Sequence, residues 1–219
     1  MDNNLKFTFE NIRGIKIHLH PDEKLSNQLR REQEFFEPGL LDYMLEHHRK
    51  QRVIIDIGAN LGNHAIYFAN FLEYKEILCF EPVPDNFKLL ELNVTYPKTK
   101  IFPIALSDKK TTLKMTPNRR NMGASMVEEN GTLDVEAITL DSLNLKDVTL
   151  LKIDVERHEP FVLAGAKETI DRCHPLILIE DRYLRYAKLL PGYVLEKAWP
   201  EYMTYLYKWV GPPSQLEEK

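Results

Sequence analysis

The sequence has few of the features that mark secreted or membrane-spanning proteins. Its 219 residues include two cysteines, Cys79 and Cys173, which lie in apolar surroundings and outside any Cys-x-x-Cys pair. We interpret both as reduced core thiols, which favours an intracellular compartment. No uninterrupted apolar run approaches the roughly 20 residues of a membrane-spanning helix, and residues 1–6 lack the pattern of a secretion signal. We therefore expect a cytoplasmic protein without a membrane span.

The sequence also lacks an excess of positive charge. Lysine and arginine number 29 against 33 aspartates and glutamates, which gives a formal net charge of -4. Such a chain has no general attraction for polyanions, so we expect no nucleic-acid partner. Hydrophobic residues make up 43% and charged residues 28% of the chain, as is ordinary for a globular protein with one large core.

One stretch of the chain organises the rest. Residues 53–63 read VIIDIGANLGN, a short apolar run that ends in an acid and two nearby glycines. A helical pattern of apolar residues follows at once and extends to residue 72, so this order predicts a strand, a tight turn and a helix. Glycines let such a turn pass close to a ligand, and the helix presents unpaired N–H groups to it. The turn is therefore a candidate nucleotide or cofactor loop.

The rest of the chain predicts an α/β fold. Alternation over residues 1–20 indicates a hairpin that turns at 11–14, and two helices are expected between 22 and 50, broken at Pro38-Gly39. Strand and helix patterns then alternate, which favours a mostly parallel, twisted sheet with helices on both faces. The expected core strands are 52–56, 77–81, 101–103, 148–154 and 176–180, and the expected core helices are 63–72, 85–96 and 160–173.

Further segments complete the expected fold. Residues 111–115 and 132–139 resemble strands that flank a polar stretch, 117–131, which has few apolar anchors and is expected to be a mobile loop near the active site. Residues 193–196 and 202–209 predict a closing antiparallel pair. We divide the chain into an N-terminal hairpin and helical cap (1–50), a core (51–211) and a flexible tail (212–219), within one domain overall.

Acids stand at the ends of three expected core strands. Asp56, Glu81 and Asp154 should converge, because ligands of such sheets bind outside the carboxyl ends of the strands. Glu81 follows Gly62 by about the spacing at which a nucleotide fold places an acid on the ribose hydroxyls. A dinucleotide-binding turn would read G-x-G-x-x-G, and an acid at position 56 would repel a pyrophosphate. The pattern suits S-adenosylmethionine, which has a cationic head, a ribose and no phosphate, although the turn alone also fits a generic strand-turn-helix unit.

Five blocks of the sequence occur in the order seen in one enzyme family. They are residues 56–62 (DIGANLG), 80–87 (FEPVPDNF), 105–108 (ALSD), 139–143 (TLDSL) and 152–159 (KIDVERHE). Over roughly residues 50–180 the chain thus resembles the FkbM-type methyltransferases. The resemblance implies a class I, Rossmann-like fold, S-adenosylmethionine as methyl donor, and usually O-methylation of a hydroxyl, often on a sugar.

The same resemblance implies roles for individual residues. Glu81 is expected to bind the ribose, and residues 106–108 are expected to frame the adenine. The methionine end of the cofactor is expected to lie against Asp56, Gly58 and Asn60. The expected cofactor site as a whole comprises Asp56, Gly58, Asn60, Gly62, Asn63, Glu81, Pro82, Leu106, Ser107, Asp108 and Asp154.

Methyl transfer to a hydroxyl needs an acceptor oxygen in line with the methyl group and a base within reach of its proton. We expect Asp154 to be that base. Lys152 shares its strand face and is expected either to favour the ionised form of Asp154 or to act as a base itself, with a plain strand-end charge as the alternative. Glu156 and His158 complete the catalytic candidates. The family usually has glycine where this chain has Arg157, and the larger side chain is expected to alter the floor of the acceptor pocket.

A metal site is a secondary hypothesis. Asp154, Glu156, His158 and Glu159 supply the donor types that bind a magnesium-type ion. Alternatively, the two glutamates cap a helix that opens near Pro160, and His158 is solvated. We favour the second interpretation and assign no metal ligands.

Several other residues have two interpretations. His64 either reaches the acceptor or faces solvent at a helix start. The pairs Arg119-Arg120 and Arg182-Tyr183 follow strand ends, where they either bind a polar acceptor or are solvated. Four aromatic residues near the C-terminus are better explained by packing than by sugar stacking: Tyr202, Tyr205, Tyr207 and Trp209.

The function that we expect from the sequence is an S-adenosylmethionine-dependent O-methyltransferase that acts on a hydroxyl of a sugar or glycan, as a monomer or homodimer. A methyltransferase for a non-sugar hydroxyl, on a polyketide or a lipid-linked molecule, would share every cofactor residue. A catalytically inactive cofactor-binding module would share them too. The residues alone leave these two alternatives open.

Overall fold

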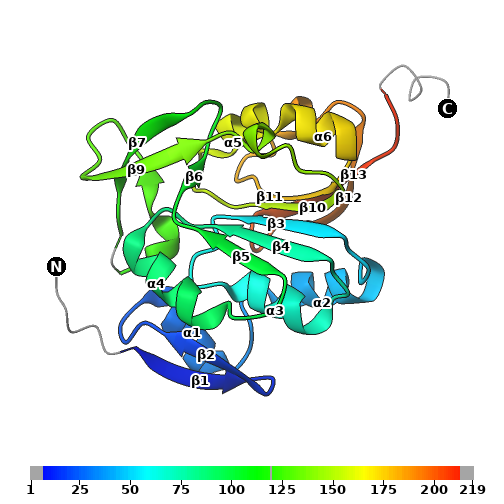
Figure 1. The fold of residues 1–219 in the computed structure, drawn as a ribbon. Coiled ribbons are helices and arrows are strands. Elements are labelled where there is room, and N and C mark those ends of the chain that lie inside the picture. Colours follow the sequence, from blue (N-terminus) through cyan, green and yellow to red (C-terminus); the bar gives the residue numbers. More distant parts are fainter. Residues whose placement is uncertain (1–6, 119, 213–219) are drawn as a thin grey trace.

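The computed structural model describes residues 7–118 and 120–212, so Arg119 and all but the first residue of the expected tail lie outside the described residues. A central sheet carries helices on both faces (Figure 1). This arrangement confirms the α/β class and the doubly covered sheet that the alternating pattern predicts.

The central sheet has seven strands in the order β12-β13-β11-β10-β3-β4-β5. The strands from β11 to β5 are parallel, and β12 and β13 form the expected antiparallel pair, with β13 inserted between β11 and β12. Strand order reverses between β3 and β10, which is the point where such sheets bind ligands. The strands are β3 (Val53–Ile57), β4 (Glu76–Phe80), β5 (Thr99–Phe102), β10 (Val148–Ile153), β11 (Leu176–Glu180), β12 (Tyr193–Trp199) and β13 (Thr204–Trp209).

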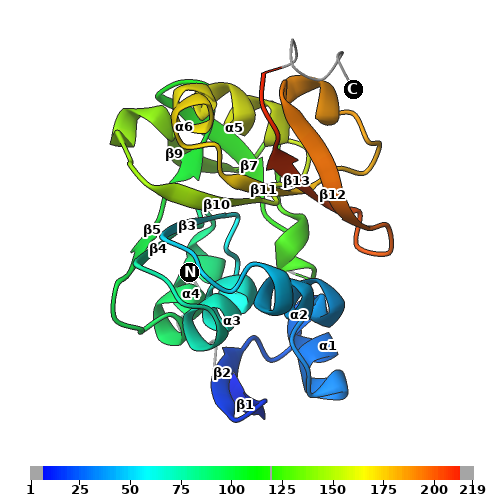
Figure 2. The same cartoon turned by 90° about the vertical axis from the view of Figure 1, so that its right-hand side faces the viewer.

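Two groups of helices cover the sheet, and Figure 2 shows them above and below it. The N-terminal hairpin of β1 (Thr8–Ile12) and β2 (Ile15–Leu19), which turns as predicted, lies outside the lower group. The lower group is α1 (Lys24–Glu32), α2 (Pro38–His47), α3 (Asn63–Phe71) and α4 (Pro84–Asn93), and the upper group is α5 (Glu159–Gly165) and α6 (Lys167–Cys173).

Each core strand supplies side chains to two apolar layers, because successive residues of a strand point to opposite faces. In β3, Ile54 joins the layer that contains α2 and α3, whereas Ile55 and Ile57 join the layer that contains α5 and α6. Asp56 falls on the same face as Ile54 and is fully buried. A carboxylate in that position needs a partner of opposite charge.

A second sheet lies beside the first, and the sequence pattern does not predict it as a unit. The expected strands at 111–115 and 132–139 are present, but two short strands join them. The order is β6-β9-β7-β8, with β6 (Ala105–Leu106), β7 (Thr111–Thr116), β8 (Met126–Val127) and β9 (Leu133–Ile138).

Among the described residues of 117–131 few apolar side chains are buried, as expected, and the N–H of one of them, Met122, donates to a carboxylate oxygen of Glu23 at 3.2 Å. One prediction was wrong. The expected helix 160–173 is two helices, since α5 ends at Gly165, whose backbone packs so closely on Ser107 that a Cβ would lie 1.9 Å from the Ser107 carbonyl oxygen.

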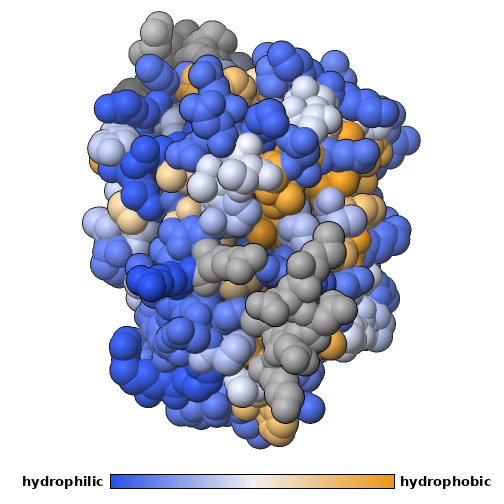
Figure 3. Space-filling model, turned by 90° about the vertical axis from the view of Figure 1, so that its left-hand side faces the viewer, coloured by the Kyte–Doolittle hydropathy of each residue, from blue (hydrophilic) through white to orange (hydrophobic). Residues whose placement is uncertain are grey.

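The two cysteines form no disulfide, and the face of the molecule shown in Figure 3 is mainly hydrophilic. Both cysteines are free, with Cys79 buried and Cys173 half-buried. On the side of the molecule that carries β7 and β9, hydrophilic residues predominate and hydrophobic residues cover a smaller part of the face (Figure 3). Across the described ranges, none of the helices combines the length and the apolar character needed to cross a membrane.

Candidate active site

Three strand-end acids converge as predicted at the reversal point of the sheet. Asp56 lies at the end of β3, Glu81 follows β4, and Asp154 follows β10, and these strands are adjacent. A cavity opens at this edge, and the space between its walls, including the open solvent at its mouth, is about 620 Å³. Its walls come from the strand ends, from the second sheet and from the 122–127 segment, and they include Gly58, Asn60, Glu81, Pro82, Asn86, Leu106, Met122, Asp154, Glu156 and His158.

The glycines of the turn after β3 are required by close contacts within the protein. Gly58 has a φ of 74°, and a Cβ there would lie 1.8 Å from the carbonyl oxygen of Asp154. Gly62 has a φ of 97°, and its Cβ would lie 2.7 Å from a methyl group of Val94. Gly58 lines the cavity, whereas Gly62 does not. The second glycine therefore serves the packing of the turn on α4.

Asn60 and Asn63 have different places in this turn. Asn60 lines the cavity in a left-handed conformation, with a φ of 50°. Asn63 points away from it, and its side chain exchanges hydrogen bonds of 2.9 and 3.1 Å with the backbone of Phe36. Asn63 therefore fixes the segment before α2 against the start of α3 rather than lining the cavity.

Glu81 is held by donors that surround its carboxylate. One oxygen accepts the N–H of Asn60 at 2.8 Å, and the other accepts the N–H of Val83 at 2.9 Å and an amide N–H of Asn86 at 3.3 Å. Burial nevertheless raises the pKa of Glu81 to about 7. Among the described residues, the amide oxygen of Asn86 has no hydrogen-bond partner. Glu81 and Asn86 both line this part of the cavity.

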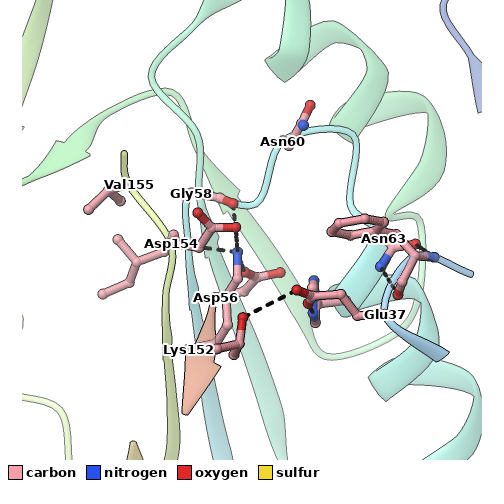
Figure 4. A network of polar contacts seen from close by, with 12 residues as sticks. Glu37, Asp56, Gly58, Asn60, Asn63, Lys152, Asp154 and Val155 are labelled. Carbon is pink, nitrogen blue, oxygen red and sulfur yellow. Dashed lines mark hydrogen bonds and ion pairs between the residues drawn. The ribbon is translucent and has the colours of Figure 1, made fainter. Parts of the chain in front are cut away.

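A buried ion pair lies directly beneath the turn. The Lys152 ammonium is 3.1 Å from an oxygen of Asp56 and 3.8 Å from one of Asp154, and it donates a 2.8 Å hydrogen bond to the carbonyl of Gly58 (Figure 4). No described residue donates a well-directed hydrogen bond to Asp56, so the charge of Lys152 is what balances this carboxylate. Burial lowers the pKa of Lys152, but Asp56 and Asp154 outweigh it and raise the pKa overall. Neither Asp56 nor Lys152 lines the cavity.

Charged side chains from two loops meet beside Asp154. Arg182 lies 3.1 Å from Glu156 and 3.4 Å from Glu180, and so links the loop after β10 to the end of β11. Burial and the neighbouring carboxylates Asp154 and Glu156 raise the pKa of Glu180 to about 8. Burial, followed by Asp154, also raises the pKa of Glu156. Sequence reasoning missed Glu180, although it ends a core strand as Asp154 does.

His158 is buried rather than solvated. Its Nε2 lies 3.0 Å from the hydroxyl of Ser107, and its ring stacks on Phe161 at 4.7 Å. Burial lowers the pKa of His158, which favours the neutral imidazole. Its neighbour Glu159 is the first residue of α5 and accepts N–H groups of the preceding loop and the hydroxyl of Tyr186. The expected capping by both glutamates is wrong in part, because Glu156 pairs with Arg182 and the N-cap residue is His158, which makes no side-chain cap hydrogen bond.

A surface groove adjoins the cavity. Val127, Glu156 and His158 line both spaces. Ser107 and Asp108, which were expected at the cofactor, line this groove and not the cavity. Within the described ranges, no group of three or more His, Cys, Asp or Glu side chains is arranged to hold a metal ion.

The remaining candidates are distributed between core and surface. His64 neither faces solvent nor lines the cavity, because it is buried with its Nε2 2.9 Å from Glu37. Tyr205 and Tyr207 are buried, in agreement with the packing interpretation. Arg182 lies beside the site, as described above, and Tyr183 is exposed next to it.

Comparison with known proteins gives a family match, two relatives and a solved structure. The methyltransferase FkbM domain matches residues 56–207. The hexuronic acid methyltransferase AglP of Haloferax volcanii is 27% identical over 150 residues, covering 65% of this chain and 61% of that protein. The 2-O-methyltransferase NoeI of Sinorhizobium fredii is 26% identical over 144 residues, covering 55% of this chain and 59% of that protein.

The chain therefore spans about three fifths of the length of these two relatives. A solved structure of an FkbM methyltransferase from Methylobacillus flagellatus superposes with a TM-score of 0.54 at 17% identity, over 74% of this chain and 44% of that one. Such a likeness shows the fold, which is that of the class I, S-adenosylmethionine-dependent methyltransferases. Together with the family match over most of its length, this means that the chain belongs to the FkbM methyltransferase family.

Proposed function

We propose that the chain is an S-adenosylmethionine-dependent O-methyltransferase that acts on a hydroxyl of a sugar or glycan, with Asp154 as the general base. One observation carries the proposal. A single strand-end cavity has a carboxylate held by backbone N–H groups, Glu81, in one wall and an accessible carboxylate, Asp154, in another. The first suits a ribose and the second suits a reacting hydroxyl.

The chemistry of the cavity walls supports this cofactor. The described lining contains no lysine or arginine, so it offers no cation to a phosphate group. Its carboxylates favour a positively charged sulfonium, and Glu81 accepts the protons of ribose hydroxyls. Apolar walls that include Phe80, Ile104 and Leu106 suit an adenine ring.

The residues around Asp154 support its role as a base. When bound, S-adenosylmethionine would supply the methyl group, and both electrons of its methyl–sulfur bond would remain on sulfur. Asp154 accepts the proton of the acceptor hydroxyl as that oxygen forms its bond to the methyl carbon. Lys152, 3.8 Å away, pairs with this carboxylate and helps to fix its position. Because Lys152 is itself an ion-paired ammonium, we assign it positioning rather than proton abstraction.

The sugar acceptor rests on the relatives. By their names, AglP methylates a hexuronic acid and NoeI is a 2-O-methyltransferase. The first name gives a sugar acid as the acceptor, and the second gives an oxygen as the methylated atom. Glu156 and His158 line both the cavity and the groove beside it, which gives an extended acceptor a continuous surface next to Asp154.

Two measurements test the proposal. Calorimetric titration with S-adenosylmethionine should show binding to the wild type and to Asp154→Asn, and no binding to the wild type would overturn the cofactor assignment. Transfer of labelled methyl to a panel of sugars should be lost in Asp154→Asn and kept in the surface control Asp134→Asn, whose carboxylate pairs with Lys114 on the second sheet. Turnover retained by Asp154→Asn would exclude that residue as the base. Addition of EDTA, with magnesium added back, tests a metal requirement.

A further inference from the structure

The turn that follows β11 is fixed at both ends. Asp181 is buried at its start, and its carboxylate accepts the N–H groups of Tyr183 at 3.2 Å and Tyr186 at 2.7 Å. The N–H of Asp181 donates to the carbonyl of Met203 at 2.8 Å. At the other end, the Tyr186 hydroxyl donates to Glu159 at 3.0 Å. These hydrogen bonds therefore hold the turn in a defined conformation.

This fixed turn presents large side chains to solvent. Tyr183 is 62% exposed and Leu184 is 57% exposed. Leu184 also has a φ of 51°, a left-handed conformation that is strained for a residue with a Cβ. Apolar groups are normally driven inward, and strain of this kind persists where the surrounding structure enforces it, often at functional sites. Exposure and strain in one turn thus point to a role at the surface.

The ring of Tyr183 is held in place from one side. The guanidinium carbon of Arg185 lies 4.5 Å from the centroid of the ring. A cation over one face restrains the ring and leaves the opposite face for another contact, as the large exposed fraction of Tyr183 allows. A ring that is already restrained loses little conformational freedom when it binds a ligand.

The turn lies next to the proposed acceptor site. Its first arginine, Arg182, contacts Glu156, which lines both the cofactor cavity and the neighbouring groove. Since β10 and β11 are parallel neighbours, with Ile153 paired to Ile179, the turn leaves the sheet at the same edge as Asp154. An acceptor longer than one sugar that leaves Asp154 on the side of β11 would therefore extend past this turn.

We infer that the exposed face of Tyr183 is a stacking platform for a sugar ring of the acceptor. The inference rests on the proposed function, because it names a subsite of the same acceptor. A pyranose ring has an apolar face of C–H groups that packs on an aromatic ring, while its hydroxyls at the edge reach polar neighbours such as Arg185. Tyrosine supplies a rigid, amphipathic contact area of the required kind.

Steady-state kinetics with methyl glycosides and with linear tri- and tetrasaccharides, each with and without uronic acid residues, tests this subsite. Tyr183→Ala should raise the KM for the longer sugars about tenfold and leave kcat and the KM for S-adenosylmethionine within about twofold, because the ring binds the acceptor and does not touch the reacting atoms. Tyr183→Trp should keep the wild-type KM. Leu195→Ala is the matched control, since Leu195 is 49% exposed on β12, the strand at the far edge of the sheet.

The outcomes separate this inference from the function on which it rests. If the wild type methylates the sugars and Tyr183→Ala has the same KM for all of them, the platform is wrong and the proposed function stands. If the wild type binds S-adenosylmethionine but methylates none of the sugars, both the sugar acceptor and the platform are overturned. A KM that rises equally in Leu195→Ala would also overturn the platform, because the effect would then not be local.

Discussion

The two sides of the proposed active site are built in different ways. On the cofactor side, Glu81 is held by backbone N–H groups of Asn60 and Val83. On the acceptor side, Arg182 forms ion pairs with Glu180, two residues before it, and with Glu156 in the loop after β10. Backbone geometry fixes the first side, and side-chain charge fixes the second.

This difference indicates which side of the active site tolerates amino-acid substitution. Backbone donors keep their positions whatever side chains surround them, so the cofactor side depends on the turn after β3 having its required shape. Ion pairs between side chains change with a single substitution, so the acceptor side can be altered without refolding the sheet. Lys152 connects the two sides, because it contacts both Gly58 and Asp154.

The largest expected effect tests the backbone fit of the cofactor side. Gly58→Ala should destabilise the protein by about 4 kcal/mol or more, because its Cβ would collide with the Asp154 carbonyl at a positive φ. Urea denaturation measures the free energy of unfolding. Gly39→Ala is the control, since a Cβ there meets nothing within 4 Å inside α2, and it should stabilise by about 0.5–1 kcal/mol. Equal stabilities of the two variants would contradict the close approach of the turn to β10.

The next effect tests the link between the two sides. Lys152→Met leaves Asp56 buried without a counter-charge and should destabilise by about 3–5 kcal/mol, as measured by denaturation. The double variant with Asp56→Asn should recover much of that loss, because it removes the uncompensated charge. Lys114→Met breaks the exposed pair with Asp134 and should change stability by no more than about 1 kcal/mol. Additive effects of the Lys152 and Asp56 substitutions would argue against the buried pair.

A third effect uses pH to isolate the cofactor side. The pKa of Glu81 is about 7 in the folded protein without ligand, above its ordinary value of 4.5. The folded state therefore binds the proton more tightly, and stability from this group is present below pH 4.5 and lost as pH rises to about 7, by about 3 kcal/mol. Glu81→Gln should remove that part of the slope in denaturation curves recorded from pH 4.5 to 7.5.

Cofactor affinity should follow the opposite trend. The ionised form of Glu81 accepts both ribose hydroxyls, so wild-type affinity for S-adenosylmethionine should rise through the same pH range, and Glu81→Gln should bind at least tenfold more weakly at pH 8. Glu76→Gln is the control, because Glu76 begins the same strand and pairs with Lys100. Wild-type affinity that is flat from pH 5 to 8 would count against Glu81 as the ribose ligand.

The smallest effect concerns the backbone of the acceptor side. Arg157 has a φ of 78°, so Arg157→Gly should stabilise the protein by about 1 kcal/mol by relieving the left-handed strain. Arg157→Ala keeps the Cβ and removes the same charge, so it is the matched control and should not show this gain. Thermal denaturation compares the two variants, and equal melting temperatures would mean that the strain at position 157 is negligible.

Much of the fold could be predicted because its signals are local. The apolar runs of β3, β4, β10 and β11, and the helix pattern after Gly62, each depend on residues close in sequence. Strands β6 and β8 of the second sheet are only two residues long, which is too short for a periodic pattern. The break between α5 and α6 could not be predicted from the sequence either, because it arises where Gly165 packs against Ser107 of a distant segment.

The residues of the candidate site also differ in whether local sequence signals could predict their roles. Glu81 and Asp154 could be found from their places at strand ends, and Glu180 could have been found by the same rule. The burial of His158 against Ser107 could not, because those residues are 51 positions apart in the chain. The roles of Gly62 and Asn63 were also hidden, since each is set by a contact with another helix or segment rather than by a ligand.

The sequence by itself determined the strand-turn-helix unit, the strand-end acids and the family blocks that predict the cofactor. These features depend on residue type and spacing within short segments, which is what a linear pattern records. Only the tertiary structure decided that Lys152 is a paired ammonium under the turn, and that Arg182 joins two carboxylates beside Asp154. Charge pairing and burial depend on which strands become neighbours, and that is settled by the packing of the whole chain.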